Sequence, residues 1–466
     1  MTRGSGLSDA YGTTLTRLKS QKGYKSVLGL KALMWVLYSE RPLRAAELCH
    51  ALGVEIGSAN LDPENVPGLR TLVSSCLGLV TVEESSSTVR LVHFTLKEYL
   101  ASDPTLFHSP HSTIAGVCLT YLNFASIRDL APNLDSAPAT TPLLEYASIH
   151  WGLHTEMGMT ENIKILALRL LDTFDEHISA QLPLLHHRWD GSQGPHFDGV
   201  GGPTGFTGLH GAAFLGVMGV VPSVLVMKKW DVNSGDCMGM TALTRAAGRG
   251  HEEVVKMLLE REDVNPDQSD TFYGRTPLSW AAENGHERIA KMLLEREDVN
   301  PYQADLKYGR TPLLWAAKKG HEGIVKMLLE REDVNPNQPN TKYGQTPRLW
   351  AAENGHDGIV KILLEREGVN PDQADTEHGQ ISLSWVADSA HDETVNLLME
   401  RNDIRTAMPY HMNQTPQPVA LPEVHYSVAR IPPERDTVNC AQADYGSQIS
   451  LSPSAMPQNE DTTQFS

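Results

Sequence analysis

The sequence is poor in cysteine, in positive charge and in long apolar runs, and each shortage excludes a class of protein. Its 466 residues include five cysteines, few and far apart, which is the usage of a reducing compartment and not of a disulfide framework. The longest apolar candidate, residues 216–227, contains Pro222 and is too short to span a bilayer. Lys and Arg total 39 against 57 for Asp and Glu, a net charge of −18, which argues against nucleic-acid and membrane partners. We therefore expect a protein of the cytoplasm, with the nucleus as an alternative.

Motifs for catalysis and for nucleotide or metal binding are also missing. The chain has no G-x-x-x-x-G-K-[ST] loop and no G-x-S-x-G elbow, and His286-Glu287 does not begin an H-E-x-x-H motif because position 290 is alanine. A polar cluster matches no metal-ligand spacing and is interpreted as chance: His186, His187, Asp190, His196 and Asp198. The sequence thus predicts no catalytic residue, no cofactor and no metal, in a protein that is not an enzyme.

An internal repeat organises the second half of the chain. Residues 274–301 read GRTPLSWAAENGHERIAKMLLEREDVNP, and close copies begin at positions 309 and 344. A looser copy begins at position 239, and degenerate copies begin near positions 207 and 379. The period is 35 residues, as the spacing of Thr241, Thr276, Thr311 and Thr346 shows.

Each repeat is predicted to contain two short helices. Thr276 suits the N-cap of the first helix, Pro277 suits its first turn, and Gly285 suits a left-handed end. The second helix begins near Glu287 and carries an apolar stripe. One such unit cannot bury its own apolar face, so the repeats are expected to stack.

Two aromatic series recur with the same period. The histidines are predicted to hydrogen-bond the turn between the helices, since stacked helices hold them too far apart to share a metal ion; they are His251, His286, His321, His356 and His391. The tryptophans are predicted to pack in the core, with a ligand-gripping ladder as the alternative; they are Trp280, Trp315, Trp350 and Trp385. Arg348 stands where Leu278 and Leu313 stand in the neighbouring repeats, which makes the packing of that repeat unusual.

The segment T-P-L-S-W-A-A-E-N-G-H at residues 276–286 resembles the ankyrin-repeat signature. The resemblance covers residues 206–404 and implies repeats at about 207–240, 241–275, 276–310, 311–345, 346–380 and 381–404. It also implies a concave groove formed by hairpin tips and first helices. By signature position the groove residues are Tyr273, Arg275, Tyr308, Arg310, Tyr343, Gln345, Glu283, Asn284, Lys318 and Lys319, with His378, Gln380, Glu353 and Asn354 at equivalent positions. Tyr and Arg are favoured at interfaces, although ordinary solvated positions are the alternative.

The first half is predicted to be helical with one β-hairpin. Helices are expected over 27–38, from Pro42, and over 66–76, followed by a hairpin of residues 79–82 and 88–94. Three helices followed by a hairpin is the order of a winged helix. The helix at 66–76 offers only Arg70 as a cation, so we interpret this domain as a packing module and not as a DNA reader.

The segments RPLRAAELCHALGVE and LVSSCLGLVTVEESSSTVRLVHFTLKEYLAS resemble fungal NACHT–ankyrin proteins, which are signal-transducing NTPases. The resemblance implies that the chain corresponds to the C-terminal part of that architecture, as a natural short form or as a truncated gene, without the NACHT domain. The expected organisation is an extension (1–26), a winged-helix-like domain (27–104), a helical region (105–189), a Gly/Pro-rich connector (190–205), the repeats (206–404) and a disordered tail (405–466).

These observations together predict a mainly α fold, with a winged-helix and helical N-terminal region followed by an ankyrin-repeat α-solenoid. The expected function is a non-catalytic scaffold or adaptor, monomeric, that binds another protein. Two alternatives stay open. One is the regulatory part of a NACHT-type NTPase switch, and the other is an auxiliary factor in a fungal specialised-metabolite pathway.

Overall fold

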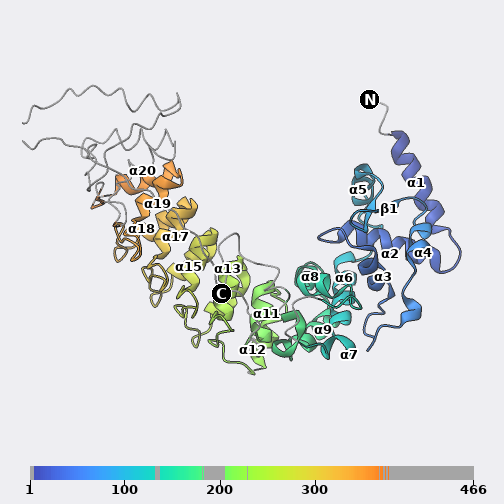
Figure 1. Ribbon diagram of the computed structural model, residues 1–466, viewed down its shortest axis with the longest axis horizontal. Helices are drawn as coiled ribbons and strands as arrows, with labels where there is room; N and C mark the ends of the chain where they lie inside the picture. Colours follow the sequence, from blue (N-terminus) through green and yellow to red (C-terminus); the bar gives the residue numbers. More distant parts are fainter. Residues whose placement is uncertain are drawn as a thin grey trace, which may run out of the picture. The chain divides into compact units, whose positions relative to one another are not determined.

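The computed structural model describes residues 5–131, 137–180, 182, 205–227, 229–366, 368–370, 373 and 376. Its N-terminal part is a winged helix, as the sequence predicts (Figure 1). The elements are α1 (Ser5–Lys19), α2 (Tyr24–Tyr38), α3 (Ala45–Gly53), the 3-10 turn η1 (Pro63–Asn65), α4 (Leu69–Ser75), β1 (Val80–Glu83), β2 (Thr88–Leu91) and α5 (Phe94–Ala101).

The two strands form an antiparallel hairpin whose backbone pairing ties it to the helices. The pairing runs from Val80 opposite Leu91 to Glu83 opposite Thr88. Beyond the hairpin, the Val89 N–H donates to the carbonyl of Leu43 at 2.8 Å. The wing is therefore held to the segment that leads into α3.

The N-terminal extension contains a packed helix, which was not predicted from the sequence. α1 contacts α2 and α5, and its Leu15 and Leu18 are 6% and 0% exposed. The hydroxyl groups of Tyr11 and Thr95 share a hydrogen bond of 2.9 Å between their oxygens. Residues 11, 15 and 18 follow the i, i+4, i+7 spacing of an amphipathic helix, which is the signal that could have identified it.

A helical region follows the winged helix. It contains α6 (Pro110–Leu122), α7 (Ala125–Arg128), α8 (Leu144–Met157), α9 (Glu161–Leu171) and the 3-10 turns η2 (Phe174–Glu176) and η3 (Ile178–Ala180). α6 packs against both α8 and α9, and α9 contacts the first helix of the repeats. Lys229 also pairs with Asp172 at 3.0 Å. The helical region is thus continuous with the hydrophobic core of the repeats.

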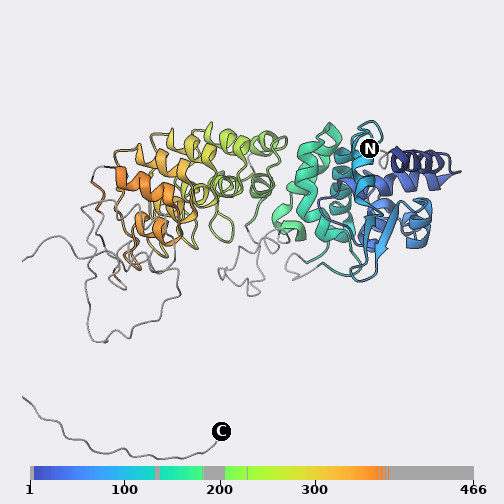
Figure 2. The ribbon, with the colours of Figure 1, turned by 90° about the horizontal axis from the view of Figure 1, so that it is seen from above.

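The repeats are pairs of short antiparallel helices in successive layers (Figures 1 and 2). The pairs are α11 (Gly208–Leu215) with α12 (Val221–Val226), α13 (Ala242–Arg249) with α14 (Glu252–Leu259), α15 (Pro277–Asn284) with α16 (Glu287–Leu294), α17 (Pro312–Lys319) with α18 (Glu322–Leu329), and α19 (Pro347–Glu353) with α20 (Asp357–Glu365). Each first helix contacts the first helix of the next pair, and the second helices from α14 to α20 do likewise.

Local hydrogen bonds explain why the same sequence folds the same way each time. The hydroxyls of Thr241, Thr276, Thr311 and Thr346 accept the backbone N–H three residues later, as expected of N-caps. Gly285 ends α15 with a φ of 76°, and an added Cβ would lie 2.5 Å from the ring of His321. Glycine is therefore required at this position by both its backbone conformation and the close approach of the histidine.

The repeating histidines that the structure describes hydrogen-bond the first helix of the preceding repeat, whereas the prediction placed these bonds at the turn between the helices. The Nε2 atoms of His251, His286, His321 and His356 lie 3.0–3.3 Å from the backbone carbonyls of Phe214, Gly248, Glu283 and Lys318. Each of these carbonyls lies near the end of the preceding first helix, where helical carbonyls lack intrahelical partners.

Several predictions concern residues outside the described part of the chain. They are the polar cluster at 186–198, the connector at 190–204, the last repeat at 381–404 with Trp385 and His391, the groove positions His378 and Gln380, and the tail at 405–466.

Candidate protein-interaction surface

Short hairpins join successive repeats, and a buried carboxylate organises the turns that precede α15 and α17. Asp270 Oδ1 accepts from the backbone N–H groups of Phe272, Tyr273 and Gly274, and Asp305 Oδ1 accepts from those of Tyr308 and Gly309. The second oxygen of each carboxylate accepts an indole N–H, Trp280 at 3.1 Å and Trp315 at 3.2 Å. In these two hairpins one acidic residue therefore holds the turn and positions the tryptophan of its own repeat. In the hairpin before α19 an amide takes this place, and Asn340 Oδ1 accepts from the N–H groups of Tyr343 and Gln345.

Adjacent hairpins are joined by backbone hydrogen bonds. The N–H groups of Leu306, Thr341 and Thr376 donate to the carbonyls of Tyr273, Tyr308 and Tyr343 at 2.8–3.0 Å. The tyrosines consequently lie on neighbouring, directly linked turns. This is the arrangement that the sequence predicted for Tyr273, Tyr308 and Tyr343 as neighbours on one surface.

Two lysines lie between these tyrosines. Lys307 Nζ is 5.1 Å from the ring centroid of Tyr273 and 5.2 Å from that of Tyr308, and Lys342 Nζ is 5.3 Å from Tyr308 and 4.7 Å from Tyr343. The tyrosines are half-buried and the lysines are exposed. We call these five residues the hairpin row. Sequence reasoning did not select the lysines, although the 35-residue period places both at one repeat position.

The expectation that Arg275, Arg310 and Gln345 project into the groove is wrong. Their exposed fractions are only 6%, 7% and 7%. The guanidinium carbon of Arg275 lies 3.9 Å from the ring centroid of Trp315 and 4.6 Å from that of Trp280. The arginines therefore lie beneath the hairpin row, because flat guanidinium groups stack favourably on aromatic faces.

Arg310 repeats this arrangement one layer further along. Its guanidinium carbon is 4.2 Å from the ring centroid of Tyr308, 4.7 Å from that of Trp315 and 5.0 Å from that of Trp350. Trp280, Trp315 and Trp350 are 1%, 3% and 9% exposed, which confirms that they are core residues. The core thus contains an alternating column of indole and guanidinium groups, which we call the aromatic–cation stack (Trp280, Arg275, Trp315, Arg310, Trp350).

The C-terminal ends of the first helices border this stack. Glu283 is half-buried and pairs with Arg275 at 2.6 Å. Lys318, also half-buried, occupies the equivalent position one repeat later, and its Nζ lies 4.2 Å from the ring centroid of Trp350. Asn284 and Lys319, one residue further along, are exposed, as expected for groove positions.

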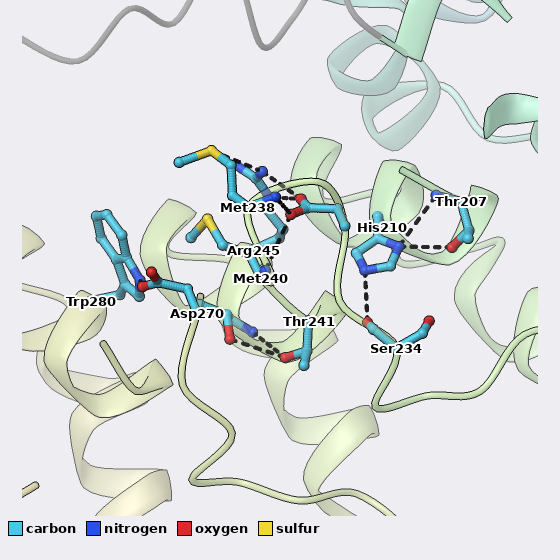
Figure 3. A network of polar contacts seen from close by, with 11 residues as sticks. Thr207, His210, Ser234, Met238, Met240, Thr241, Arg245, Asp270 and Trp280 are labelled. Carbon is cyan, nitrogen blue, oxygen red and sulfur yellow. Dashed lines mark hydrogen bonds and ion pairs between the residues drawn. The ribbon is translucent and has the colours of Figure 1, made fainter. Parts of the chain in front are cut away.

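The layer that begins at Thr241 is built differently. Arg245 occupies the position of Trp280, and it forms a buried ion pair with Asp236, the carboxylate of the preceding hairpin (Figure 3). His210, one layer earlier, bridges its own N-cap Thr207 and the carbonyl of Ser234 (Figure 3). The aromatic–cation stack therefore begins only with Trp280.

Exposed acidic residues follow the second helices of the repeats. Glu295 and Glu297 follow α16 and are exposed, and we call them the acidic edge. Nearby, the ion pairs Arg261–Asp263, Arg296–Asp298 and Arg331–Asp333 span 2.6–2.9 Å at the surface. Exposed pairs of this kind contribute little to stability.

The described residues show few features of other kinds of site. No group of three or more His, Cys, Asp or Glu side chains there is placed to hold a metal ion. Within the same residues, no helix combines the length and the apolar character needed to cross a membrane. α4, the third helix of the winged helix, carries Arg70 as its one basic residue, so it lacks the cluster of cations that contacts with phosphate require.

Comparison with known families agrees with this architecture. The family described as ankyrin repeats (3 copies) matches residues 183–270, 262–340 and 332–408. The family described as the winged helix domain of GPI inositol-deacylase matches residues 16–112. No curated protein matches the chain. The chain therefore consists of a winged-helix domain and ankyrin repeats within a mainly helical fold, and ankyrin repeats support a role in protein interaction.

Proposed function

We propose that the chain is a non-catalytic adaptor whose hairpin row and first-helix ends bind a segment of another protein. The observation that carries the proposal is the row itself, in which Tyr273, Tyr308 and Tyr343 alternate with two exposed lysines over three linked turns. Half-buried tyrosines offer large contact areas and lose little side-chain entropy on binding.

The turns that carry the row are preformed by hydrogen bonds and expose further apolar area. Phe272 and Leu306 are 41% and 83% exposed at the same turns, so apolar area is available next to the tyrosines. The turns themselves are held by Asp270 and Asp305 and by the interlayer hydrogen bonds described above. A preformed surface reduces the ordering cost of association.

The proposal is tested by capture from an extract of the source cells. Tyr273→Ala combined with Tyr308→Ala should weaken capture of a protein partner by about 2 kcal/mol or more, the scale of an interface hot spot. The matched control is Glu295→Ala combined with Glu297→Ala on the acidic edge, which should leave capture nearly unchanged. If the acidic-edge variant abolishes capture and the tyrosine variant does not, the partner uses the other surface.

A second candidate is the regulatory part of a NACHT-type NTPase switch. It is supported by the order of a winged helix, a helical region and ankyrin repeats, which resembles the C-terminal part of fungal NACHT–ankyrin proteins. A transcript that continues upstream into a phosphate-binding loop would support this candidate. The adaptor proposal includes a monomer located in the cytoplasm or nucleus, and gel filtration and imaging test these two points.

A further inference from the structure

The three layers of the aromatic–cation stack differ in the charges at their equivalent positions. The layer of Thr276 contains Asp270, Arg275 and Glu283; the layer of Thr311 contains Asp305, Arg310 and Lys318; the layer of Thr346 contains Asn340, Gln345 and Glu353. Counting formal charges at these positions gives an excess of one negative charge in the first layer, one positive charge in the second and one negative charge in the third. The middle layer is therefore the cationic one.

The two cations of the middle layer lack the ion pairs that its neighbour has. Arg275 pairs with Glu283, whereas neither Arg310 nor Lys318 has a carboxylate within ion-pair distance among the described residues. The guanidinium of Arg310 donates no hydrogen bond to those residues, and its Nε is fully covered. Burial lowers the pKa of Arg310, and the nearest opposing charge is that of Asp305, which lies beyond ion-pair distance; the faces of Tyr308, Trp315 and Trp350 surround the guanidinium.

Lys318 likewise has no carboxylate within ion-pair distance among the described residues. Its ammonium group lies over Trp350, and the charged groups around it are Arg310, Lys319, Glu283 and Glu353. Burial, and then the positive charge of Arg310, lowers the pKa of Lys318 to about 8. An anion bound between the two cations would relieve both effects.

We propose that Arg310 and Lys318 together bind a carboxylate side chain from an acidic segment of the partner protein. This inference rests on the proposed function, and it specifies the chemistry of the bound segment. A carboxylate can accept from the guanidinium and the ammonium group at once, and the surrounding rings exclude water and strengthen such charge-assisted bonds. The exposed Lys307, Lys319 and Lys342 extend the positive surface around the pair.

Charge complementarity favours this occupant over others. The chain as a whole has a net charge of −18, so an acidic segment is repelled from most of its surface. The positive region at the middle layer is the place where such a segment is attracted, which gives both orientation and specificity. A basic segment, by contrast, would meet two partly desolvated cations.

The test uses the purified full chain and random-sequence peptides displayed on phage. Peptides selected by wild-type protein should be enriched in Asp and Glu. Lys318→Glu reproduces the Arg–Glu arrangement of Arg275 and Glu283, so it should remain folded and should weaken binding of the selected peptides by about tenfold or more. Lys318→Gln removes the charge without reversing it and should weaken binding in the same direction.

The matched control is Lys326→Glu. Lys326 lies on α18 in the same repeat and is exposed, so this substitution changes the net charge by the same amount at a distance from the site. It should change affinity by less than about twofold, since exposed charges are screened by salt. Equal losses in the Lys326 and Lys318 variants would reduce the effect to general electrostatics and overturn the inference.

The remaining outcomes separate this inference from the proposed function. Peptides that lose affinity with Tyr308→Ala but not with Lys318→Glu would leave the groove proposal standing and refute the carboxylate site. Peptides enriched in phosphoserine analogues alone, when a phosphorylated library is used, would also refute it. If neither Tyr308→Ala nor Lys318→Glu weakens the binding of any selected peptide, both proposals fail.

Discussion

Replacing Trp315 by alanine tests the aromatic–cation stack, because this indole lies at its centre. The ring is 3% exposed, and the guanidinium carbons of Arg275 and Arg310 lie 3.9 and 4.7 Å from its centroid. Its N–H donates to Asp305 Oδ2 at 3.2 Å. The substitution thus removes a buried ring, two cation–π contacts and the indole partner of a buried carboxylate oxygen.

The expected loss in the free energy of unfolding is large. Truncating a buried aromatic side chain to alanine costs about 3–5 kcal/mol, and the carboxylate oxygen that loses its donor adds about 1–3 kcal/mol. These contributions overlap, so we expect a total of about 4–6 kcal/mol. Domains of this kind are stable by only about 5–15 kcal/mol, and the variant should therefore unfold at a much lower urea concentration.

Trp315→Phe is the control, since it keeps an aromatic face between the arginines but removes the N–H donor. It should cost about 1–3 kcal/mol, the range for a buried acceptor left without its partner. The assay is urea unfolding followed by circular dichroism, with fits that allow for partial unfolding of a repeat array. A loss below about 1 kcal/mol for Trp315→Ala would refute the stacked geometry and would revive the ligand-gripping interpretation of the tryptophans.

Four further outcomes are expected from the sequence and the structure. Lys318→Glu should raise the free energy of unfolding by about 1–2 kcal/mol in urea melts, because it gives Arg310 a charged hydrogen-bond partner. A lower urea midpoint would contradict the view that Arg310 and Lys318 repel each other in the folded chain. Arg348→Leu should raise the urea midpoint, since a guanidinium that is 2% exposed is replaced by the leucine of the neighbouring repeats. A lower midpoint would show that the hydrogen bonds of Arg348, one of them to the carbonyl of Asn370, outweigh the cost of burying its charge. Affinity for acidic peptides should fall between about pH 7 and pH 9 as Lys318, with its lowered pKa, loses its proton, and Lys318→Arg should remove this dependence in fluorescence titrations. Calorimetry of the purified chain should show no ATP or GTP binding at micromolar affinity, because the sequence contains no phosphate-binding loop.

The sequence predicted the repeats well because each relevant signal is local. The threonine N-caps, the left-handed Gly285 and the buried tryptophans all lie within one repeat, and the 35-residue period confirms each of them several times over. The winged helix was predictable for the same reason, since the order of its helices and hairpin can be read directly along the chain.

The burial of the arginines could not be predicted in this way. Arg275 contacts Trp315, a residue 40 positions later and in the next repeat. The repeat position places Arg275 on a hairpin but does not say whether its side chain projects outward or lies back over the next layer. The contact between the arginine and tryptophan series joins two repeats, so the sequence of one repeat does not reveal it.

A footprint on the intact chain tests the central claim most directly. Amide hydrogen exchange should be measured on the purified protein with and without a partner captured from the source cells. The account predicts that protection on binding is concentrated in the hairpins at residues 271–274, 306–309 and 341–344 and at the ends of α15 and α17. Protection confined to α16, α18 and the acidic edge would contradict it.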